Sequence, residues 1–363
     1  STKTKIFCSC ENDFGAEPNT HCCPVCVGHP GTLPKINRQV VNFAVKAGLA
    51  TNCKINLRSK MDRKNYVYPD LAKAYQISQF EIPICKDGFV ELSSGKKIRI
   101  NRIHMEEDAG KLVHNGGDVY IDYNRGGVPL IEIVTEPDIS SSDEAKEYVE
   151  KLQNILRYAG VSDCKMQEGS MRCDVNISVK PEGSEKFGTR TEIKNMNSIT
   201  FMTKAIDYEY ERQIDLIESG EEVIQQTLRY CEATNSTESM RSKEDAQDYR
   251  YFRDPDLVEI VLTEEEVEKI KESLPEMPGD RLKRYVSELG IPEKDAMHLT
   301  KYKNVSDFFE KACEGLKSAK TVSNLIVGEI FRSIQTESEK EKFEILITPA
   351  KLGELVKLTE ENK

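Results

Sequence analysis

The chain of 363 residues lacks several features that would place it in a common class. It contains no run of eighteen apolar residues, so we expect no membrane-spanning helix. Its first residues, Ser-Thr-Lys-Thr-Lys-Ile-Phe-Cys, do not form a signal peptide. They also lack an initiating Met, so we expect a fragment or a processed product whose first residues enter a strand directly.

Two nucleotide-binding motifs are also missing. The sequence has no G-x-x-x-x-G-K-[ST], so a nucleotide would not sit on a P-loop, and no G-x-G-x-x-G indicates a dinucleotide fold. There is no internal repeat and no low-complexity segment. Any bound nucleotide must therefore be held in another way.

The charge balance is acidic, with a formal net charge of -11. This balance argues against a protein that coats nucleic acid non-specifically, although it leaves room for a local basic patch that binds RNA. The length allows two or three domains. Eleven cysteines without a secretion signal favour a reducing compartment, here the cytoplasm, with metal ligands and buried thiols rather than disulfides.

Four cysteines near the start have the spacing of a zinc site. Cys8 and Cys10 form C-x-C, and Cys23 and Cys26 form C-x-x-C after a short Gly/Pro/Asn loop within residues 7–30. Two such pairs predict a tetrahedral, structural Zn²⁺ site. His21 and Cys22 are further candidate ligands, and the alternative interpretation is a set of reduced loop thiols.

The stretch from Met171 to Asn195 predicts an antiparallel hairpin. Its first half alternates apolar and polar residues with a period of two, and the turn-rich segment 181–188 follows. A fold symmetric about residue 183 would place Asp174 opposite Glu192 and Arg172 opposite Lys194. Like charges facing each other destabilise a sheet, but they suit a divalent metal beside an anionic phosphate. The alternative interpretation is a solvated hairpin with a charged face.

Residues 96–137 predict successive strands with further acidic residues. Glu106, Glu107 and Asp108 stand at a strand end before Ala109-Gly110-Lys111, which resembles a corner that binds metal and phosphate. His104 is a candidate ligand or simply a hydrogen-bonded histidine. Tyr123–Gly127 is a turn whose glycines allow close backbone approach. Glu132 is a carboxylate in an otherwise apolar run, so it needs a partner.

Two segments combine charged and aromatic residues. Residues 54–68 carry five cations and are followed by Tyr75, a composition that suits a single-stranded RNA end or a solvated loop. Residues 240–257 mix four cations, including Lys243, with acids, including Glu244, around three aromatic rings. Their aromatic density favours a packed loop that lines a site.

The fold class predicted by these patterns is α+β. Helices are expected at about 34–51, 143–159 and 198–219, and the strands lie between them. After residue 274 strand patterns are absent and five helical segments follow, the longest at 319–335. We therefore expect an α+β domain at 1–274 and an α-helical domain at 275–363.

Several motifs in one order resemble a single family, the B subunits of the aspartyl/glutamyl-tRNA amidotransferases. They span most of the first 275 residues: FCSC…CPVC, YPDLAKAYQISQF, HMEEDAGK, DYNRGGVPLIEIVTEPD, GSMRCDVNISV, TRTEIKNMNS and MRSKEDAQDYRYF. The resemblance implies that ATP phosphorylates the side-chain carboxylate of Glu on tRNA(Gln) or Asp on tRNA(Asn). Ammonia released from glutamine by the amidase (A) subunit then displaces the phosphate, in a complex that includes a small (C) subunit.

The resemblance also implies a fold and a set of site residues. The first domain would be a mixed or antiparallel-sheet cradle similar to the catalytic core of glutamine synthetase, and the helical domain would begin the tRNA-binding C-terminal region. The Mg²⁺ ligands would be Glu107, Asp174 and Glu192. From position alone, the candidates for gripping ATP phosphates are the following cations: Arg172, Lys194, Arg125 and Lys111. The stretch 54–68 would help to hold the tRNA acceptor end.

The sequence departs from the family pattern in three places. The family's first strand, with L-E-V-H, and its C-terminal tail domain are not in this sequence, and Arg253 stands where the family usually has Pro. Two other functions compete with the amidotransferase: a zinc-stapled RNA-binding module without catalysis, and a ligase of glutamine-synthetase type that acts on free amino acid. We expect the fragment to need the missing first strand for activity.

Overall fold

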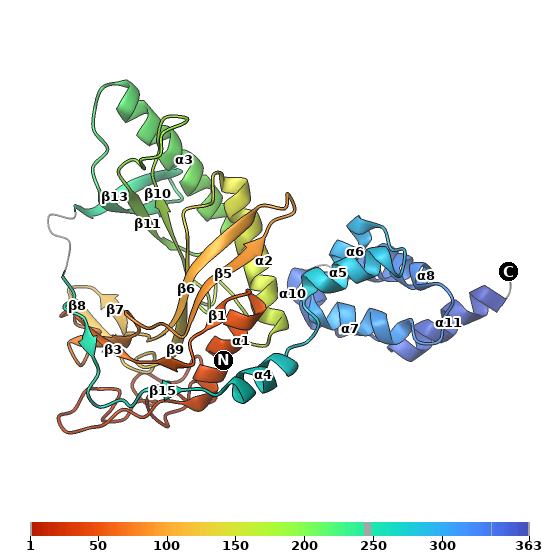
Figure 1. Cartoon of the computed structure of the whole chain (residues 1–363), viewed down its shortest axis with the longest axis horizontal. Coiled ribbons are helices and arrows are strands. Elements are labelled where there is room, and N and C mark those ends of the chain that lie inside the picture. Colours follow the sequence, from red (N-terminus) through yellow and green to blue (C-terminus); the bar gives the residue numbers. More distant parts are fainter. Residues whose placement is uncertain (1, 243–247, 335, 362–363) are drawn as a thin grey trace. The chain divides into compact units, whose positions relative to one another are not determined.

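The structure is a computed structural model that describes residues 2–242, 248–334 and 336–361. The chain forms two compact units (Figure 1). The first contains Ser1–Gln153 and Val161–Lys271, and the second contains Asn154–Gly160 and Glu272–Lys363. The main division between the units therefore falls close to residue 274. The short segment Asn154–Gly160 also belongs to the second unit.

The first unit contains both helices and strands. Its helices are α1 (Arg38–Ala50), α2 (Ser142–Tyr158, whose last residues belong to the second unit), α3 (Ile199–Glu218) and α4 (Glu264–Glu272). Its strands are β1 (Lys54–Ile55), β2 (Arg58–Ser59), β3 (Asp62–Asn65), β4 (Tyr75–Ser78), β5 (Cys85–Glu91), β6 (Lys97–Glu107), β7 (Lys111–Asn115), β8 (Asp118–Asp122), β9 (Pro129–Thr135), β10 (Cys173–Ile177), β11 (Thr191–Met196), β12 (Gln226–Cys231), β13 (Ser236–Ser242), β14 (Phe252–Arg253) and β15 (Ile260–Val261). The α+β prediction is confirmed.

Two four-stranded sheets dominate the first unit. One has the order β1-β5-β6-β9 and is antiparallel throughout. The other has the order β10-β11-β12-β13 and is mixed, because β12 runs parallel to β11. Smaller sheets pair β14-β3-β4, β15-β2 and β7-β8.

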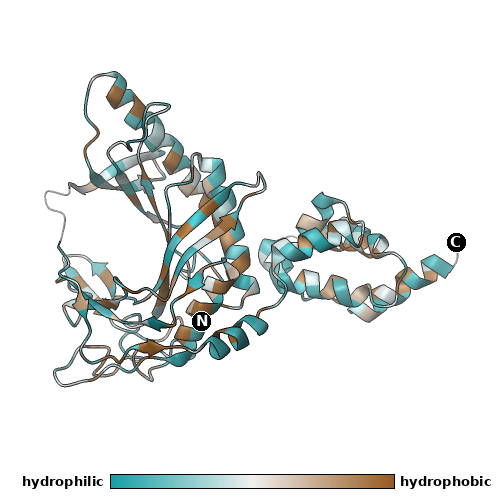
Figure 2. Cartoon of the chain, viewed as in Figure 1, coloured by the Kyte–Doolittle hydropathy of each residue, from teal (hydrophilic) through white to brown (hydrophobic). Residues whose placement is uncertain are grey.

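The first sheet buries one face against α1. Strand β6 alternates between exposed and buried residues over much of its length, which Figure 2 shows as alternating hydrophilic and hydrophobic colours. Helix α1 contacts β1, β5 and β6, and its buried face includes Val40, Val41, Ala44 and Val45. The alternating buried residues of β6 and the apolar face of α1 thus pack into one layer. This layer stabilises β6, the strand that carries His104 and Glu106.

Side-chain caps fix where the three longest helices of the first unit begin. The Asn37 side chain accepts from the backbone N–H of Gln39, so α1 starts at Arg38 rather than at the predicted 34. Ser198 caps α3 in the same way, and Ser141 accepts from the N–H of Glu144 at the start of α2. The predicted helices at 143–159 and 198–219 are confirmed to within one residue at each end.

The part of the second unit that follows residue 277 is built from helices. They are α5 (Pro278–Ser287), α6 (Glu293–Thr300), α7 (Lys303–Ala312), α8 (Ala319–Asn324), the π-helix η1 (Leu325–Ile330), α9 (Phe331–Ser333), α10 (Glu337–Lys342) and α11 (Pro349–Glu361). The predicted helix at 319–335 is therefore split by a π-helical turn. Tyr285, Phe309, Val305 and Leu299 are among the fully buried side chains of its apolar core.

Two expectations for the fold need correction. The first residues do not form the expected strand. Thr4 makes only an isolated bridge with Glu11. Strands β12 and β13 were not anticipated, although they extend the sheet of the hairpin beside β11. Within the described residues, every helix is too short or too polar to cross a bilayer.

Candidate functional site

The hairpin at 173–196 forms, but its predicted register is wrong. Asn176 pairs with Glu192 and Cys173 pairs with Met196, so Asp174 falls in a register shift opposite Lys194 and Asn195. The pairing is displaced by two residues from a fold centred on residue 183. Because the displacement is even, Asp174 and Glu192 still share one face of the sheet.

A cation stands between the two carboxylates of this face. Lys194 Nζ lies 3.4 Å from a Glu192 oxygen and 3.9 Å from an Asp174 oxygen. Glu192 also accepts a hydrogen bond from the Thr227 hydroxyl on the neighbouring strand, at 3.3 Å. The predicted facing of like charges is thus replaced by an alternation of anion and cation, which needs no bound metal to be stable.

Helix α3 holds the hairpin from behind. Its Glu209 is fully buried and accepts from the Thr191 hydroxyl at 2.9 Å. Gln213 donates to the same hydroxyl at 2.9 Å, and its side-chain oxygen accepts from the N–H of Val179 on the other arm. A Cβ at Gly188 would lie 2.1 Å from the carbonyl oxygen of Val179, so the hairpin arms approach too closely there for any other residue.

A second charged group lies on β6 and β9. His104 and Glu132 are a direct cross-strand pair, and His104 Nε2 lies 3.0 Å from Glu132 and 3.1 Å from Glu106. Glu132 has the partner that the sequence analysis expects, but its side chain is 55% exposed, so burial does not impose that partner. Together the three residues bring one nitrogen and two carboxylate oxygens within 4.8 Å of one another, an arrangement that could hold a metal ion.

The pKa shifts of His104 and Glu106 favour the charged form of each, so the two side chains form an ion pair. Burial opposes charge on His104, but hydrogen bonds to Glu106 and Glu132 outweigh it and raise the pKa of the imidazole. Burial also opposes charge on Glu106, but the hydrogen bond and charge of His104, with the Ser78 hydrogen bond and the charge of Lys64, together outweigh burial and lower the pKa of that carboxyl. Arg102 Nε makes a long contact of 3.4 Å with His104 Nδ1.

The two charged groups interact. Partial burial raises the pKa of Asp174, the charges of Lys194 and Arg172 oppose that rise, and the charges of Glu192 and Glu132 add to it. The charge of Glu132 on β9 therefore contributes to the raised pKa of Asp174 on β10, although the two strands belong to different sheets. We call the set His104, Glu106, Glu132, Asp174 and Glu192 the carboxylate centre.

Glu107 has a different environment from its neighbour Glu106. Successive residues of a strand point to opposite faces, and the buried Glu107 carboxylate accepts from Lys73 Nζ and from the N–H of Ile77 at 2.9 Å. Within the part of the chain that the structure describes, Glu107 belongs to no group of three ligand atoms within 4.8 Å, and the same holds for Asp174 and Glu192.

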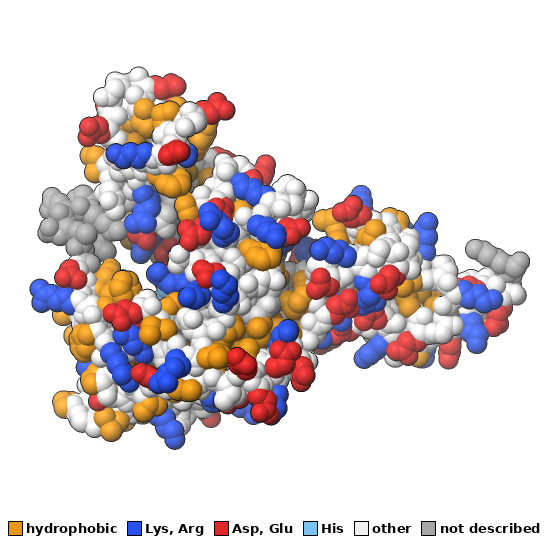
Figure 3. Space-filling view, viewed as in Figure 1, with side chains coloured by type: hydrophobic (Ala, Val, Ile, Leu, Met, Phe, Trp, Pro, Cys, Tyr) orange, Lys and Arg blue, Asp and Glu red, His pale blue; other side chains and the backbone are white. Residues whose placement is uncertain are grey.

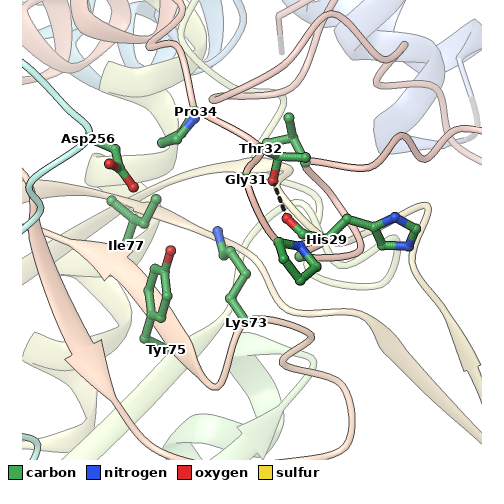
Figure 4. Close-up of a pocket in the computed structure, with 11 residues that line it drawn as sticks. His29, Gly31, Thr32, Pro34, Lys73, Tyr75, Ile77 and Asp256 are labelled. Atoms are coloured by element: carbon green, nitrogen blue, oxygen red, sulfur yellow. Dashed lines mark hydrogen bonds between the residues drawn. The ribbon is translucent and has the colours of Figure 1, made fainter.

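The lysine that holds Glu107 also lines a pocket of about 220 Å³. Figure 4 shows the side chains of Lys73, Tyr75 and Asp256 converging on this space beside the loop that contains His29 and Thr32. Asp256 is paired with Arg63 at 2.9 Å. The charges of Lys73 and Asp256 in the pocket are therefore already paired inside the chain.

The candidate phosphate-binding cations differ in their partners and in their exposure. Arg172 Nη2 lies 2.6 Å from Asp108, and Arg125 Nε lies 3.7 Å from the same oxygen while donating to the carbonyl of Ala109. Lys111 is exposed at the start of β7. Lys194 and Arg172 are thus close to the carboxylate centre, since both act on the pKa of Asp174.

Four of the five cations in residues 54–64 form ion pairs inside the chain. The pairs are Lys54–Asp87, Arg58–Glu259, Lys60–Glu81 and Arg63 with Asp254 and Asp256. Lys64 instead lies over the ring of Tyr249, with Nζ 4.7 Å from its centroid. Its charge also helps to lower the pKa of Glu106. Figure 3 shows basic and acidic side chains interspersed over the visible surface.

The segment 248–257 packs against this stretch. Tyr251 stacks on Phe80 with ring centroids 4.3 Å apart, and Tyr249 meets Tyr66 edge to face. Strand β14 pairs with β3. Lys243 and Glu244, which the sequence interpretation included in the same segment, lie outside the described residues.

The four predicted zinc ligands come together. All four sulfurs of Cys8, Cys10, Cys23 and Cys26 lie within 4.8 Å of one another, with Sγ–Sγ distances of 3.5 to 3.8 Å from Cys26 to the other three. Tetrahedral Zn–S bonds of about 2.3 Å place sulfurs about 3.8 Å apart, so the group fits Zn²⁺. A hydrogen bond from Cys8, aided by the charge of Lys5, lowers the pKa of Cys26 to about 4 against the effect of burial.

We predict that the purified chain carries about one zinc ion and that Cys10→Ser loses it. Elemental analysis and thermal unfolding measure the effect, because a closed thiolate site contributes ~10 kcal/mol or more to local folding. Cys231→Ser, which changes a cysteine of β12 outside the four-cysteine site, is the matched control. Full zinc retention by Cys10→Ser would contradict the assignment.

We predict that His104→Gln destabilises the chain by about 1–3 kcal/mol at pH 6 and by less at pH 9. The folded pKa of His104 is raised, so the stability that its charge contributes is complete below the unfolded pKa and is lost as pH rises through the folded pKa. Denaturant unfolding of both proteins at the two pH values measures the difference. An equal cost at both pH values would show that His104 is not charged in the folded chain.

The comparisons with known proteins now give the family. Residues 1–268 match the GatB/GatE catalytic domain. The chain belongs to this family. It is 55% identical over 361 residues to the B subunit of the aspartyl/glutamyl-tRNA(Asn/Gln) amidotransferase of Thermoanaerobacter pseudethanolicus, and the match covers 98% of this chain and 76% of that protein.

Other relatives carry the same name. The B subunit of Caldanaerobacter subterraneus subsp. tengcongensis is 54% identical over 365 residues, and that of Clostridium novyi is 52% identical over 361 residues. The first match covers 99% of this chain and 77% of the relative, and the second covers 98% and 76%. The prediction of an amidotransferase component, part of an enzyme that forms carbon–nitrogen bonds, is confirmed.

The sequence interpretation groups Glu106 with Glu107 and places Lys64 in a stretch that suits RNA, so it misses how these two residues relate to the carboxylate centre. A period-two reading of β6 would have placed His104 and Glu106 on one face and Glu107 on the other. The pairing of His104 with Glu132 depends on the β6–β9 register, for which the sequence holds no local signal.

Proposed function

We propose that the carboxylate centre activates the side-chain carboxylate of an aminoacyl-tRNA for amidation. The substrates would be Glu-tRNA(Gln), Asp-tRNA(Asn) or both, with ATP as phosphoryl donor and ammonia supplied by a glutaminase partner. The observation that carries this proposal is the pair of carboxylate clusters on two sheets, Asp174 and Glu192 around Lys194 and Glu106 and Glu132 around His104. The family of the chain supports the same reaction class.

The chemistry requires such a centre. A carboxylate is a poor electrophile because its leaving group would be oxide, so ammonia cannot attack it directly. Transfer of the γ-phosphoryl group of ATP to a carboxylate oxygen forms an acyl phosphate, and ammonia then attacks the acyl carbon and expels inorganic phosphate. The first step brings two anions together, which repel unless cations lie between them.

The residues fit these demands in two sets. Asp174, Glu192, Glu132 and Glu106 supply the hard oxygen ligands that Mg²⁺ prefers. When bound, Mg²⁺ neutralises phosphate charge and orients the transferring group. Arg172, Lys194 and Lys64 can turn from their present partners to incoming phosphates. Glu107 remains a proposed ligand from the resemblance, and it would have to leave Lys73.

The proposal includes the wider assembly. The first 274 residues would form a cradle similar to glutamine synthetase, and residues 275–363 would begin the tRNA-binding region. The amidase (A) and small (C) subunits would complete the enzyme, the former releasing ammonia from glutamine. Arg125 and Lys111, near the turn that follows β8 and at the start of β7, would contact phosphates of ATP or of the tRNA acceptor end.

We predict that Asp174→Ala lowers the rate of ATP-dependent phosphorylation of Glu-tRNA(Gln) by at least 100-fold in the assembled parent enzyme. The reason is the loss of a carboxylate that would hold the Mg²⁺ that neutralises the phosphate charge. Glu185→Gln, an exposed change in the turn of the same hairpin, is the matched control and should keep full activity. The assay follows acyl phosphate formation and ADP release with ammonia absent.

Three outcomes would contradict the proposal. Unchanged activity of Asp174→Ala would remove the carboxylate centre from catalysis. Equal ATP turnover with free glutamate and no tRNA would indicate a free amino acid ligase. Tight tRNA binding without any ATP hydrolysis would favour an RNA-binding module.

A further inference from the structure

Lys5 lies between the four cysteines and the turn that carries Arg125. Its side chain is fully buried, and its Nζ donates to Cys26 Sγ at 3.4 Å and to the Tyr123 carbonyl at 3.1 Å. A buried ammonium requires strong acceptors, and four thiolates around a divalent metal carry a net charge of about −2. The zinc site therefore offers Lys5 an anionic partner. Because Lys5 also donates to the backbone of the turn, it links the zinc site to the turn.

The loop between the two cysteine pairs is docked on the same turn by five hydrogen bonds of 2.7 to 3.0 Å. Asn19 makes three of them, to Asp122, to the carbonyl of Ile121 and from the N–H of Tyr123. Asn124 makes the other two, and its side chain bridges the backbone of residues 17 and 21. The turn thus receives much of its shape from the cysteine loop.

This turn also positions charged groups near the carboxylate centre. Arg125 donates to the carbonyls of Ala109 and Gly110, at 3.0 and 2.7 Å. The Asp108 carboxylate lies between Arg125 and Arg172, 3.7 and 2.6 Å from their nitrogens. Arg172 is next to the strand that carries Asp174, and its charge opposes the rise in the pKa of that carboxyl.

We propose that Lys5 is a positioning residue that couples the four-cysteine site to Arg125, Asp108 and Arg172. Metal at the cysteines fixes Cys26 and the loop, Lys5 and Asn19 fix the turn, and the turn fixes the cations beside the carboxylate centre. This inference rests on the proposed function for its consequence in catalysis. The structural coupling itself can be tested without any activity.

The test is hydrogen exchange of the 363-residue chain, followed by mass spectrometry, with zinc bound and after removal by a chelator. We expect faster exchange in peptides that cover 108–112, 121–128 and 170–174 once zinc is removed. Peptides from 278–361 serve as the internal control and should not change. Faster exchange confined to residues 5–30 would overturn the coupling, even if amidation requires zinc.

Lys5→Met provides the second arm, with Lys3→Met, an exposed neighbour, as its matched control. We expect Lys5→Met to lose zinc to a chromogenic chelator about tenfold faster or more, as for other lost partners of metal ligands. With zinc bound, it should still show faster exchange at 121–128. Zinc transfer and exchange identical to Lys3→Met would overturn the role of Lys5. If Lys5→Met does not fold, the chelation arm on the unaltered chain decides.

The two proposals fail separately. Absence of Glu-tRNA amidation together with zinc-dependent exchange at 108–112 and 121–128 would reject the proposed function and retain the coupling. Normal amidation with no change in exchange at those peptides would reject the coupling and retain the function.

Discussion

The first unit depends on one physical constraint, the need to keep several carboxylates close together without letting them repel. Lys194 meets this constraint on the hairpin by standing between Asp174 and Glu192. His104 meets it on the first sheet by standing between Glu106 and Glu132. Each cation makes its cluster stable before any ligand arrives, which allows the site to exist preformed. A metal ion or a phosphate could then exchange partners with these cations rather than create the site.

Supports outside the charged face hold both sheets of the centre. Strand β6 is fixed by the apolar layer under α1, and the hairpin is fixed by the buried Glu209 and Gln213 of α3. Neither support is itself part of the charged face. Separation of the supports from the charged groups lets the centre carry strongly interacting charges without exposing the core.

The sequence predicted the composition of the site better than its geometry. Alternation in the hairpin correctly placed Asp174 and Glu192 on one face, but the register is set by where the ladder resumes after the long connection 178–190, and the composition of that connection does not encode it. The cysteine spacing predicted a local cluster, because residues near in sequence define it. The His104–Glu132 contact joins residues from distant strands, so the sequence indicated only that Glu132 needs a partner.

The most direct test of the central claim is where a divalent ion binds in crystals of the chain soaked with Mn²⁺, read from anomalous diffraction. The account predicts an anomalous peak in contact with Asp174 or Glu192 and within reach of Glu132. A peak confined to another acidic group, such as Glu11 with Asp13 and His21, would contradict it. In that case the facing carboxylates of the two sheets would serve the fold rather than the chemistry.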